Sequence, residues 1–479
     1  MTRTRRWLLP AATAIAVGAT SLLVAPSATA QPAAPAAACD ETSPAYSYVV
    51  LFQPRTQQRD VEKEMAEKCG STISYYSEIG VAVATSRNAD FQERVGVFRA
   101  YSGNKEVAEA PGTEAARIRA TARAGGADDE TLERTTTVAA TADLSAQQWD
   151  MRAIKAPEAN AIDPGSSRVT VGVIDSGIEP THPALAHTID TSASAGCLTG
   201  APDTTPAAWA PTNSDHGTHV AGTIAGKDAA TGFTGIAPGV KLASVKVVSD
   251  EGLIYPEAAV CAFMWSAEHD FPVTNNSYYI DPGMFYCPKQ SGDAAAYEAV
   301  RRSVAYSQRK GVLNVAAAGN SGFDIPAQTT DPNRPHEVDS SCAILPKGLD
   351  GVVTTSAVGY AGTKSSYSNY GKNEIDVTAP GGDRAQIPPA GEGADCPLST
   401  VFDGGYGTKC GTSMASPHAA GVAALLAGKY RHIPPHALAT LLGAKADPVP
   451  CAGAEGCTGP DRNNSFYGKG MVNALNAVR

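Results

Sequence analysis

Short apolar runs alternate with longer stretches of helical composition from about Leu144 to Arg479. Runs that are apolar on both faces, separated by segments long enough for helices, are typical of a buried parallel sheet with helical crossovers. We therefore predict an α/β fold with a mainly parallel sheet here. The predicted strands are residues 169–174, 242–248, 273–275, 312–316 and 352–357. Active sites of such sheets lie at the carboxyl ends of the strands.

A second, smaller α/β unit is predicted between about Tyr46 and Ala110. Its sequence contains two compact apolar runs and two stretches of helical composition. The predicted strands are 48–52 and 80–84, and the predicted helices are 61–68 and 90–98. A unit of this size buries little surface and is only marginally stable alone.

The segment from about Pro111 to Asp143 has a different composition. It consists largely of Ala, Thr, Arg and Gly, with little apolar periodicity. We expect an exposed linker, which is the kind of segment that proteases cut.

Residues 1–30 have the pattern of an export signal. A basic start with Arg3, Arg5 and Arg6 precedes the apolar run 7–24, and Ala28-Thr29-Ala30 supplies the small residues that a signal peptidase requires. A membrane anchor is the alternative, but the small-residue exit and the polar, Ala/Pro-rich sequence that follows argue against it. We expect a secreted, extracellular protein with no membrane anchor. A weak resemblance to a twin-arginine signal at residues 4–6 leaves the export route open.

The composition narrows the class of protein. The 46 Gly and 33 Pro follow no repeat period, which argues against a collagen-like or low-complexity chain. Hydrophobic residues make up 43% of the 479 residues, enough for a large core and for two or three units. The formal net charge is −10 and no Lys/Arg-rich stripe follows the N-terminus, so nucleic acid is not an expected partner.

The cysteine content agrees with export. Ten cysteines, an even number, indicate disulfides rather than metal ligands in a protein that leaves the cytoplasm. The full pairing stays open, but near neighbours are favoured. We expect Cys396–Cys410 and Cys451–Cys457 to close small loops.

Candidate functional residues lie where predicted strands end and predicted helices begin. Asp175 ends the first predicted strand, where an acidic residue alone usually caps the next turn. His216 lies where a loop passes into a helix and is placed to be exposed, whereas His219, one turn later, is expected to be buried. The H-x-x-H spacing is a weak metal signal without a further ligand to complete a shell.

Two further polar residues have similar positions. Ser413 precedes the apolar run 419–427, so it lies at or near a helix N-terminus, where free N–H groups and the helix dipole favour an oxyanion. Pro417 is tolerated only in the first helical turn, which limits where that helix begins. Alone, Ser413 is better explained as a plain helix cap, because such caps are common. Asn320 follows a predicted strand, and alone it is most often a turn residue, although its amide can also donate to a reacting carbonyl.

Taken together, these residues lie in strings that occur in a fixed order. The strings V-I-D-S-G, H-G-T-H-V-A-G-T and G-T-S-M-A-S-P-H resemble the three signature blocks of the subtilase family, and A-A-G-N resembles its oxyanion block. The resemblance covers about residues 145–479 and implies a subtilisin-like, three-layer α/β/α peptidase domain at 141–479. More weakly, residues 31–140 resemble the family's inhibitory propeptide, a small ferredoxin-like α+β unit followed by a linker.

The resemblance also implies an activity. The chain is expected to be a secreted serine endopeptidase that acts through an acyl-enzyme on Ser413 and removes its own propeptide. Asp175, His216 and Ser413 would form the catalytic triad, and Asn320 would bind the oxyanion together with the Ser413 backbone N–H. The expected partners are polypeptide substrates and the propeptide as inhibitor, and the expected state is a monomer.

One stretch departs from the family pattern. Where the family commonly has Ser-Leu-Gly-Gly, this chain has Ser277-Tyr278-Tyr279-Ile280. Ser277, Tyr278 and Tyr279, with Gly319, are expected to bind substrate. Because strand residues alternate faces, only one of the two tyrosines is expected to point into the cleft, with Tyr279 narrowing a pocket. The alternative is that one tyrosine packs under the loop 281–287.

No cofactor is expected for the chemistry and no metal ligands are assigned. Structural calcium is usual in the family, but the loop 227–233 offers only Asp228, so calcium dependence stays open. Two other functions are less consistent with the sequence. A non-catalytic scaffold is disfavoured because all four chemical positions are intact. A serine esterase is disfavoured because no G-x-S-x-G surrounds Ser413 and the Asp, His, Ser order is wrong for that fold.

Overall fold

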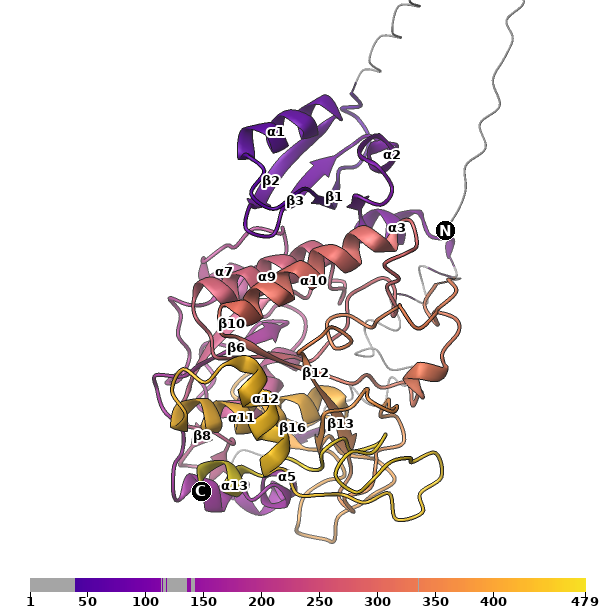
Figure 1. Cartoon of the computed structure of the whole chain (residues 1–479). Coiled ribbons are helices and arrows are strands. Elements are labelled where there is room, and N and C mark those ends of the chain that lie inside the picture. Colours follow the sequence, from indigo (N-terminus) through magenta and orange to yellow (C-terminus); the bar gives the residue numbers. More distant parts are fainter. Residues whose placement is uncertain (1–38, 113, 115–117, 119–135, 139–142, 335) are drawn as a thin grey trace, which may run out of the picture. The chain divides into compact units, whose positions relative to one another are not determined.

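The computed structural model describes residues 39–112, 114, 118, 136–138, 143–334 and 336–479 (Figure 1). The expected signal at 1–30 and most of the expected linker lie outside these residues. By its contacts, the segment 40–479 forms one unit.

A seven-stranded sheet lies at the centre of the C-terminal part. Every strand pair in it is parallel, and the order is β14-β13-β12-β11-β6-β10-β7. The strands are β6 (Thr170–Asp175), β7 (Ala195–Gly196), β10 (Lys241–Lys246), β11 (Val273–Asn276), β12 (Leu313–Ala317), β13 (Val353–Val358) and β14 (Val377–Pro380). All five predicted strands are therefore confirmed. The strands β7 and β14 were not predicted, because they have 2 and 4 residues and are too short to show a pattern.

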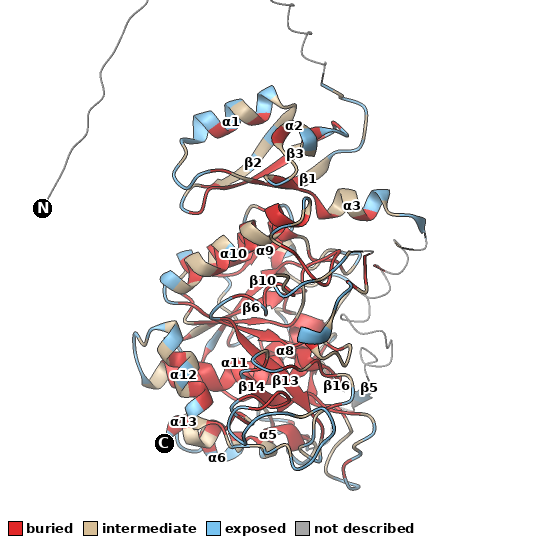
Figure 2. Cartoon of the chain, turned by 45° about the vertical axis from the view of Figure 1, so that its right-hand side comes forward, coloured by how far each residue is buried: buried red, intermediate tan, exposed pale blue. Residues whose placement is uncertain are grey.

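Helices cover both faces of this sheet, and the buried residues gather between the layers (Figure 2). In β6, Val173 packs in one core cluster with Val220, while its neighbour Ile174 packs in the opposite cluster with Val260 and Ala299. This alternation confirms the predicted three-layer α/β/α architecture. The first cluster involves α8 (His216–Ala225), α11 (Thr412–Lys429), α12 (Pro435–Lys445) and α13 (Ala474–Val478), and the second involves α9 (Pro256–Glu268) and α10 (Asp293–Arg309). Within the described parts of the chain, no helix has the length and apolar character needed to cross a bilayer.

Shorter elements complete the C-terminal part. They are the helices η1 (Ser145–Gln147), α5 (Trp149–Ala153), α6 (Ala156–Asn160), α7 (Pro206–Trp209) and η2 (Ile325–Ala327), and the strands β8 (Lys227–Asp228), β9 (Phe233–Thr234), β15 (Leu398–Val401) and β16 (Gly405–Thr408).

Two described parts of the expected linker make contacts with the rest of the chain. The strand β5 (Thr136–Val138) pairs antiparallel with β16. Ile118 is buried in a small cluster with Val107 and Leu253. The prediction of an exposed linker is therefore wrong at Ile118, whereas Thr137 of β5 is exposed as predicted although it belongs to a strand. Neither a three-residue strand nor a single buried side chain produces a periodic pattern that the sequence could reveal.

The N-terminal part has the β-α-β-β-α-β order of a ferredoxin-like unit. Its antiparallel sheet has the order β2-β3-β1-β4, and the predicted α+β unit is confirmed. The elements are β1 (Tyr46–Leu51), α1 (Gln58–Glu67), β2 (Gly70–Tyr76), β3 (Val81–Ser86), α2 (Phe91–Val95) and β4 (Ala100–Tyr101), followed by α3 (Gly103–Glu109). Side chains such as Tyr48 and Val50 pack with Met65 in the unit's own core. The intervening Val49 belongs to the same cluster as Val260 of α9, so the other face of the sheet packs on the helices of the C-terminal part.

Arg302 of α10 fixes this packing with polar contacts. Its Nη1 donates to the main-chain oxygens of Phe52 at 2.8 Å, Ile79 at 3.1 Å and Gly80 at 3.4 Å. Its Nε donates to Glu298 Oε1, four residues earlier on α10, at 2.7 Å, which holds the guanidinium in place. One side chain of α10 therefore binds the main chain of the N-terminal unit at two turns.

Arg334 forms a second connection. It is 1% exposed, and its Nη1 lies 2.9 Å from Asp293 Oδ1 at the start of α10 and 3.3 Å from Glu106 Oε1 of α3. Tyr101 donates its hydroxyl to the other oxygen of Glu106 at 2.8 Å. Removing one of these carboxylates would leave the buried charge of Arg334 partly unpaired, which is energetically costly. The ion pair between Arg334 and Glu106 therefore stabilises the packing of α3 on the C-terminal part.

Disulfides link several loops, and both predicted near-neighbour pairs, Cys396–Cys410 and Cys451–Cys457, are confirmed. Cys197–Cys261 and Cys287–Cys342 are two further bonds. Cys39 and Cys69 are disulfide-bonded as well.

Candidate active site

Asp175 and His216 meet at the carboxyl edge of the parallel sheet. Asp175 is the last residue of β6 and His216 is the first residue of α8. His216 Nδ1 and Asp175 Oδ1 are 2.8 Å apart, and the Ser176 backbone N–H donates to the same oxygen at 2.7 Å. Both residues are buried, contrary to the expected exposure of His216, because its ring lies against the strand end.

A close approach of two backbones makes this pairing possible. A Cβ at Gly217 would lie 2.5 Å from the Gly177 carbonyl oxygen and 3.1 Å from Asp175 Cβ. Only a glycine therefore lets the first turn of α8 approach the end of β6. The Gly217 N–H donates to Ser176 Oγ at 2.9 Å, which fixes the approach.

Ser413 is the second residue of α11, so the prediction that it lies at a helix N-terminus is confirmed. Helices α8 and α11 pack against each other. Ser413 Oγ donates to the Ser277 carbonyl oxygen at 3.3 Å, and Ser277 Oγ donates to the Ser413 carbonyl oxygen at 2.8 Å. The disulfide of Cys410 ties down the chain just before the serine.

The expectation that Pro417 lies in the first helical turn is wrong. Helix α11 begins at Thr412, and Pro417 lies in its interior. Proline has no N–H, so it cannot donate to the carbonyl four residues earlier, which is that of Ser413. Ser277 replaces this missing donor, because its hydroxyl donates to the Ser413 oxygen. The serine from the predicted substrate-binding stretch therefore supports the helix that carries Ser413.

Asn320 follows β12 and lies against the start of α11. Its Oδ1 accepts the Thr412 backbone N–H at 2.8 Å and the Thr412 hydroxyl at 2.7 Å. These two bonds orient the carboxamide, because its NH₂ group must then face away from Thr412. The Gly319 N–H donates to Thr412 Oγ1 at 3.1 Å, so the loop and the helix are joined at two consecutive residues.

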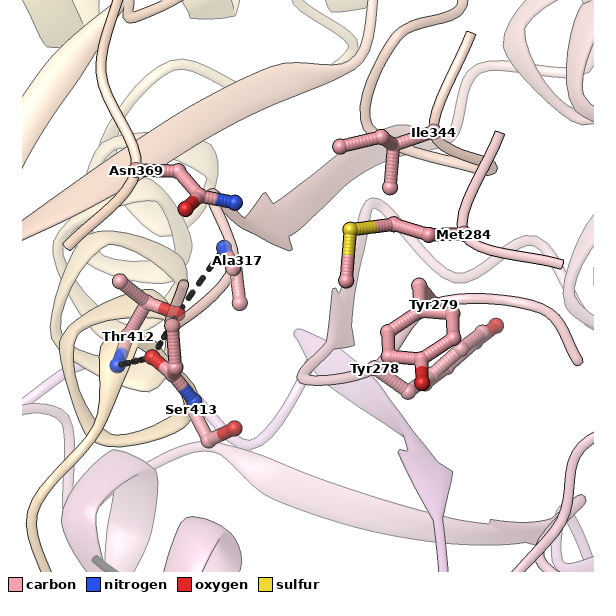
Figure 3. A pocket seen from close by; sticks show the side chains of 10 residues that line it. Tyr278, Tyr279, Met284, Ala317, Ile344, Asn369, Thr412 and Ser413 are labelled. Carbon is pink, nitrogen blue, oxygen red and sulfur yellow. Dashed lines mark hydrogen bonds between the residues drawn. The ribbon is translucent and has the colours of Figure 1, made fainter. Parts of the chain in front are cut away.

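A pocket opens beside Ser413 (Figure 3). The figure shows Asn369, Ala317, Thr412 and Ser413 on one side and Met284, Ile344, Tyr278 and Tyr279 on the other. The disulfide Cys287–Cys342 joins the two loops that carry Met284 and Ile344. The pocket is lined by Tyr278, Tyr279, Met284, Ala317, Gly319, Asn320, Ile344, Asn369, Thr412 and Ser413.

Both tyrosines line this pocket, but their side chains pack in different clusters: Tyr278 lies against the core under α9 and α10, and Tyr279 lies with Met284 and Ile344. Strand β11 ends at Asn276, and the alternation of a regular strand does not extend to residues 278 and 279. The Tyr278 hydroxyl donates to Asn276 Oδ1 at 2.9 Å. The Tyr279 hydroxyl accepts from Asn333 Nδ2 at 3.1 Å, and its ring packs with Met284 and its neighbours. Tyr279 therefore combines the two roles that the sequence left as alternatives.

His219 is buried, as predicted. Its Nε2 lies 3.1 Å from the Gly407 carbonyl oxygen. Burial, together with the nearby charge of Lys409, holds the pKa of the His219 imidazole well below its usual value. The ring is therefore neutral and supports the packing of α8 on β16.

The loop 227–233, for which calcium dependence was left open, does not fit a metal site. Asp228 accepts hydrogen bonds from the Ala230 N–H, the Thr231 hydroxyl and the Tyr406 hydroxyl, which use both of its carboxylate oxygens. Among the residues that the structure describes, no cluster of three His, Cys, Asp or Glu side chains could hold a metal ion. We derive no role for calcium.

Several pocket residues were not identified from the sequence. Thr412 lies inside a string that pointed only to Ser413. Met284, Ile344 and Asn369 come from loops without periodicity, and no local signal marks them. Only the fold brings these residues to the serine.

This arrangement of Asp, His and Ser on a parallel α/β/α sheet can be compared with known proteins. The model of the subtilase family matches residues 166–470. The chain belongs to the subtilase family. Subtilisin DY from Bacillus licheniformis is 29% identical over 68% of this chain and 96% of its own length. Subtilisin E from Bacillus subtilis is 30% identical over 68% of this chain and 70% of its own length. Thermitase from Thermoactinomyces vulgaris is 29% identical over 70% of this chain and 97% of its own length.

Similar solved structures confirm the fold. The epidermin leader peptide processing serine protease from Staphylococcus aureus has a TM-score of 0.68 at 20% identity, covering 91% of this chain and 99% of its own. Fervidolysin from Fervidobacterium pennivorans has a TM-score of 0.61 at 21% identity, covering 91% of this chain and 61% of its own. With its subtilisin relatives, this subtilase is a serine endopeptidase that acts on polypeptides and needs no cofactor for catalysis.

Proposed function

We propose that Asp175, His216 and Ser413 are the catalytic triad of this subtilase. The observation that carries the proposal is the buried hydrogen bond between Asp175 and the ring of His216, formed where β6 ends and α8 begins. The neighbouring helix α11 supplies Ser413 at its second position. An acid that orients a histidine beside a serine is the arrangement that nucleophilic acyl transfer requires.

Each catalytic residue has a chemical role in this proposal. Ser413 Oγ attacks the carbonyl carbon of the scissile bond while His216 takes the hydroxyl proton. The carbonyl π electrons move to oxygen, and Asn320 Nδ2 and the Ser413 N–H stabilise that oxyanion. When the C–N bond breaks, His216 returns the proton to the leaving amine and an acyl group remains on Ser413. Water then repeats the sequence and releases the acid, while Asp175 stabilises the protonated ring.

The pocket beside Ser413 is proposed to bind the substrate side chain on the acyl side of the bond. Ser277, Tyr278, Tyr279 and Gly319 are the substrate-binding residues in this proposal. The apolar atoms of Met284 and Ile344 favour an uncharged side chain, and the Tyr279 ring limits its size.

We also propose that residues 1–30 are a signal peptide, that 31–140 form an inhibitory propeptide with its linker, and that 141–479 form the secreted, monomeric peptidase. The packing of the N-terminal unit on α9 and α10 supports the propeptide assignment, because Arg302 binds its main chain there. Self-cleavage within the linker would release the unit.

A serine-directed phosphonate probe tests the triad. We expect the probe to label the wild-type enzyme and to leave Ser413→Ala unlabelled. Ser416→Ala is the matched control, because Ser416 lies on the same helix and its hydroxyl is bound to Asn275 Oδ1 at 2.7 Å. Labelling of folded Ser413→Ala at the wild-type rate would contradict the assignment.

Self-processing has its own test. The Ser413→Ala chain, secreted from a host without other proteases, should keep its N-terminal unit, while wild type loses it. Maturation of the variant in that host would overturn self-cleavage but leave the triad untouched.

A further inference from the structure

The loop that carries Asn320 folds around the side chain of Asn369. Asn369 Oδ1 accepts the backbone N–H groups of Ser321 and Phe323, each at 3.0 Å. Its Nδ2 donates to the Ala318 carbonyl oxygen at 3.1 Å. One carboxamide therefore binds three main-chain groups on either side of Asn320.

The main chain of Asn369 adds a fourth contact, because its N–H donates to the Gly319 carbonyl oxygen at 2.9 Å. Gly319 has φ of 100°, and a Cβ there would collide with Asn369 Nδ2. The turn before Asn320 is therefore shaped to the carboxamide and depends on a glycine. Asn369 is 0% exposed, so water cannot replace these hydrogen bonds.

We propose that Asn369 is a positioning residue for the oxyanion donor. It holds the loop 318–323, and this loop holds Asn320 against Thr412. The Gly319 N–H donates to Thr412 Oγ1, and that hydroxyl donates to Asn320 Oδ1, so the contacts run without a break from Asn369 to the residue before Ser413. The inference rests on the proposed oxyanion role of Asn320.

Position matters because an oxyanion donor works only at hydrogen-bond distance from the developing charge. In a subtilisin, the case for which this effect has been measured, loss of one oxyanion donor lowers kcat by about 10²–10³. Asn369→Asp keeps the size and the two acceptor bonds but loses the donor to the Ala318 oxygen and places a carboxylate beside it. We expect kcat to fall about 10- to 100-fold with little change in KM, because the donor is displaced and not removed.

A double-mutant cycle with Asn320→Ala tests the route of the effect. If Asn369 acts through Asn320, Asn369→Asp should cost less than about 3-fold in kcat when Asn320 is already alanine. Active-site titration of each matured enzyme limits the comparison to folded molecules. If Asn369→Asp yields no folded enzyme, Asn369→Ser supplies the same cycle, because its hydroxyl is too short to bind both sides of the loop.

Asn464 offers a matched control. It is 4% exposed, its Oδ1 accepts the N–H groups of Phe466 at 3.2 Å and Tyr467 at 2.9 Å, and its Nδ2 donates to the Val449 oxygen at 2.8 Å. It therefore makes the same set of bonds, but in a C-terminal loop that does not line the pocket. Asn464→Asp should lower stability and keep kcat.

The experiments distinguish failure of the positioning role of Asn369 from failure of the oxyanion role of Asn320. An equal kcat loss in the Asn369 and Asn464 variants, or a full loss by Asn369→Asp in the Asn320→Ala background, would overturn the positioning role. If Asn320→Ala alone leaves kcat unchanged, the proposed oxyanion donor is wrong.

Discussion

Glu257 is a buried carboxyl whose protonation should affect the stability of the full-length chain. It lies in the first turn of α9, is 2% exposed, and its Oε2 has no hydrogen-bond partner among the described residues. A Cβ at Gly200 would lie 2.7 Å from the Val83 side chain and 3.1 Å from Glu257 Cβ, so Val83 of the N-terminal unit and Glu257 both pack against Gly200. Tyr76 donates its hydroxyl to the Gly200 oxygen at 2.8 Å.

Burial raises the pKa of the Glu257 carboxyl to about 7, and only its own backbone N–H opposes the shift. An unfolded chain exposes the carboxyl, which then titrates near its ordinary value of about 4.3. Between these two values the folded chain binds more protons, so stability is highest at low pH and falls as the pH rises. From pH 5 to pH 8 the loss is about 2–3 kcal/mol, and above the folded pKa it stops growing.

The comparison is between Ser413→Ala and Ser413→Ala/Glu257→Gln, since both are expected to remain uncleaved. Urea unfolding at pH 5, 6, 7 and 8 gives the free energy of unfolding, and the glutamine variant should gain about 2–3 kcal/mol relative to its parent across this range. Burial also raises the pKa of Asp281, to about 8, but Asp281 is present in both chains and cancels in the difference.

Glu158→Gln is the control. Glu158 also follows a proline in the first turn of a helix, α6, but it is exposed. This substitution should leave the pH dependence unchanged. Parallel pH profiles for the Glu257→Gln chain and its parent would refute the reasoning, because they would show that Glu257 titrates equally in both states.

Three further outcomes are expected. In a pH–rate profile, kcat/KM should fall below about pH 6, because a histidine base must be neutral to accept a proton; an unchanged rate between pH 7 and 5 would exclude His216 as the base. A thiol reagent should find no free thiol in the denatured, unreduced mature enzyme, whereas one equivalent or more would contradict the pairing. Tyr279→Gly should raise the ratio of kcat/KM for large over small side chains on the acyl side, while Tyr279→Phe keeps the ring and the ratio. If the glycine variant keeps the wild-type ratio, Tyr279 does not limit the pocket.

The sequence predicts the position of a residue only where a pattern in the neighbouring residues marks it. Asp175, His216 and Ser413 stand at the ends of strong apolar patterns, so both their strings and their places in the fold were visible. The interior position of Pro417 was not, because the compensating hydroxyl of Ser277 comes from a distant strand end. The contributions of Met284, Ile344 and Asn369 to the pocket could not be predicted either, because these loop residues come together only in the folded chain. Patterns along the chain show which element a residue belongs to, but not which loops meet.

The main-chain contacts of Arg302 have a consequence for which substitutions this contact tolerates. Its guanidinium binds the carbonyl oxygens of Phe52, Ile79 and Gly80, and every amino acid carries a carbonyl. Substitutions at Phe52 or Ile79 therefore leave these acceptors in place as long as the two turns keep their path. The constraint falls on Arg302 itself and on Gly80, whose φ of 62° favours glycine. This contact therefore depends on the path of the main chain at the two turns and not on which side chains stand there.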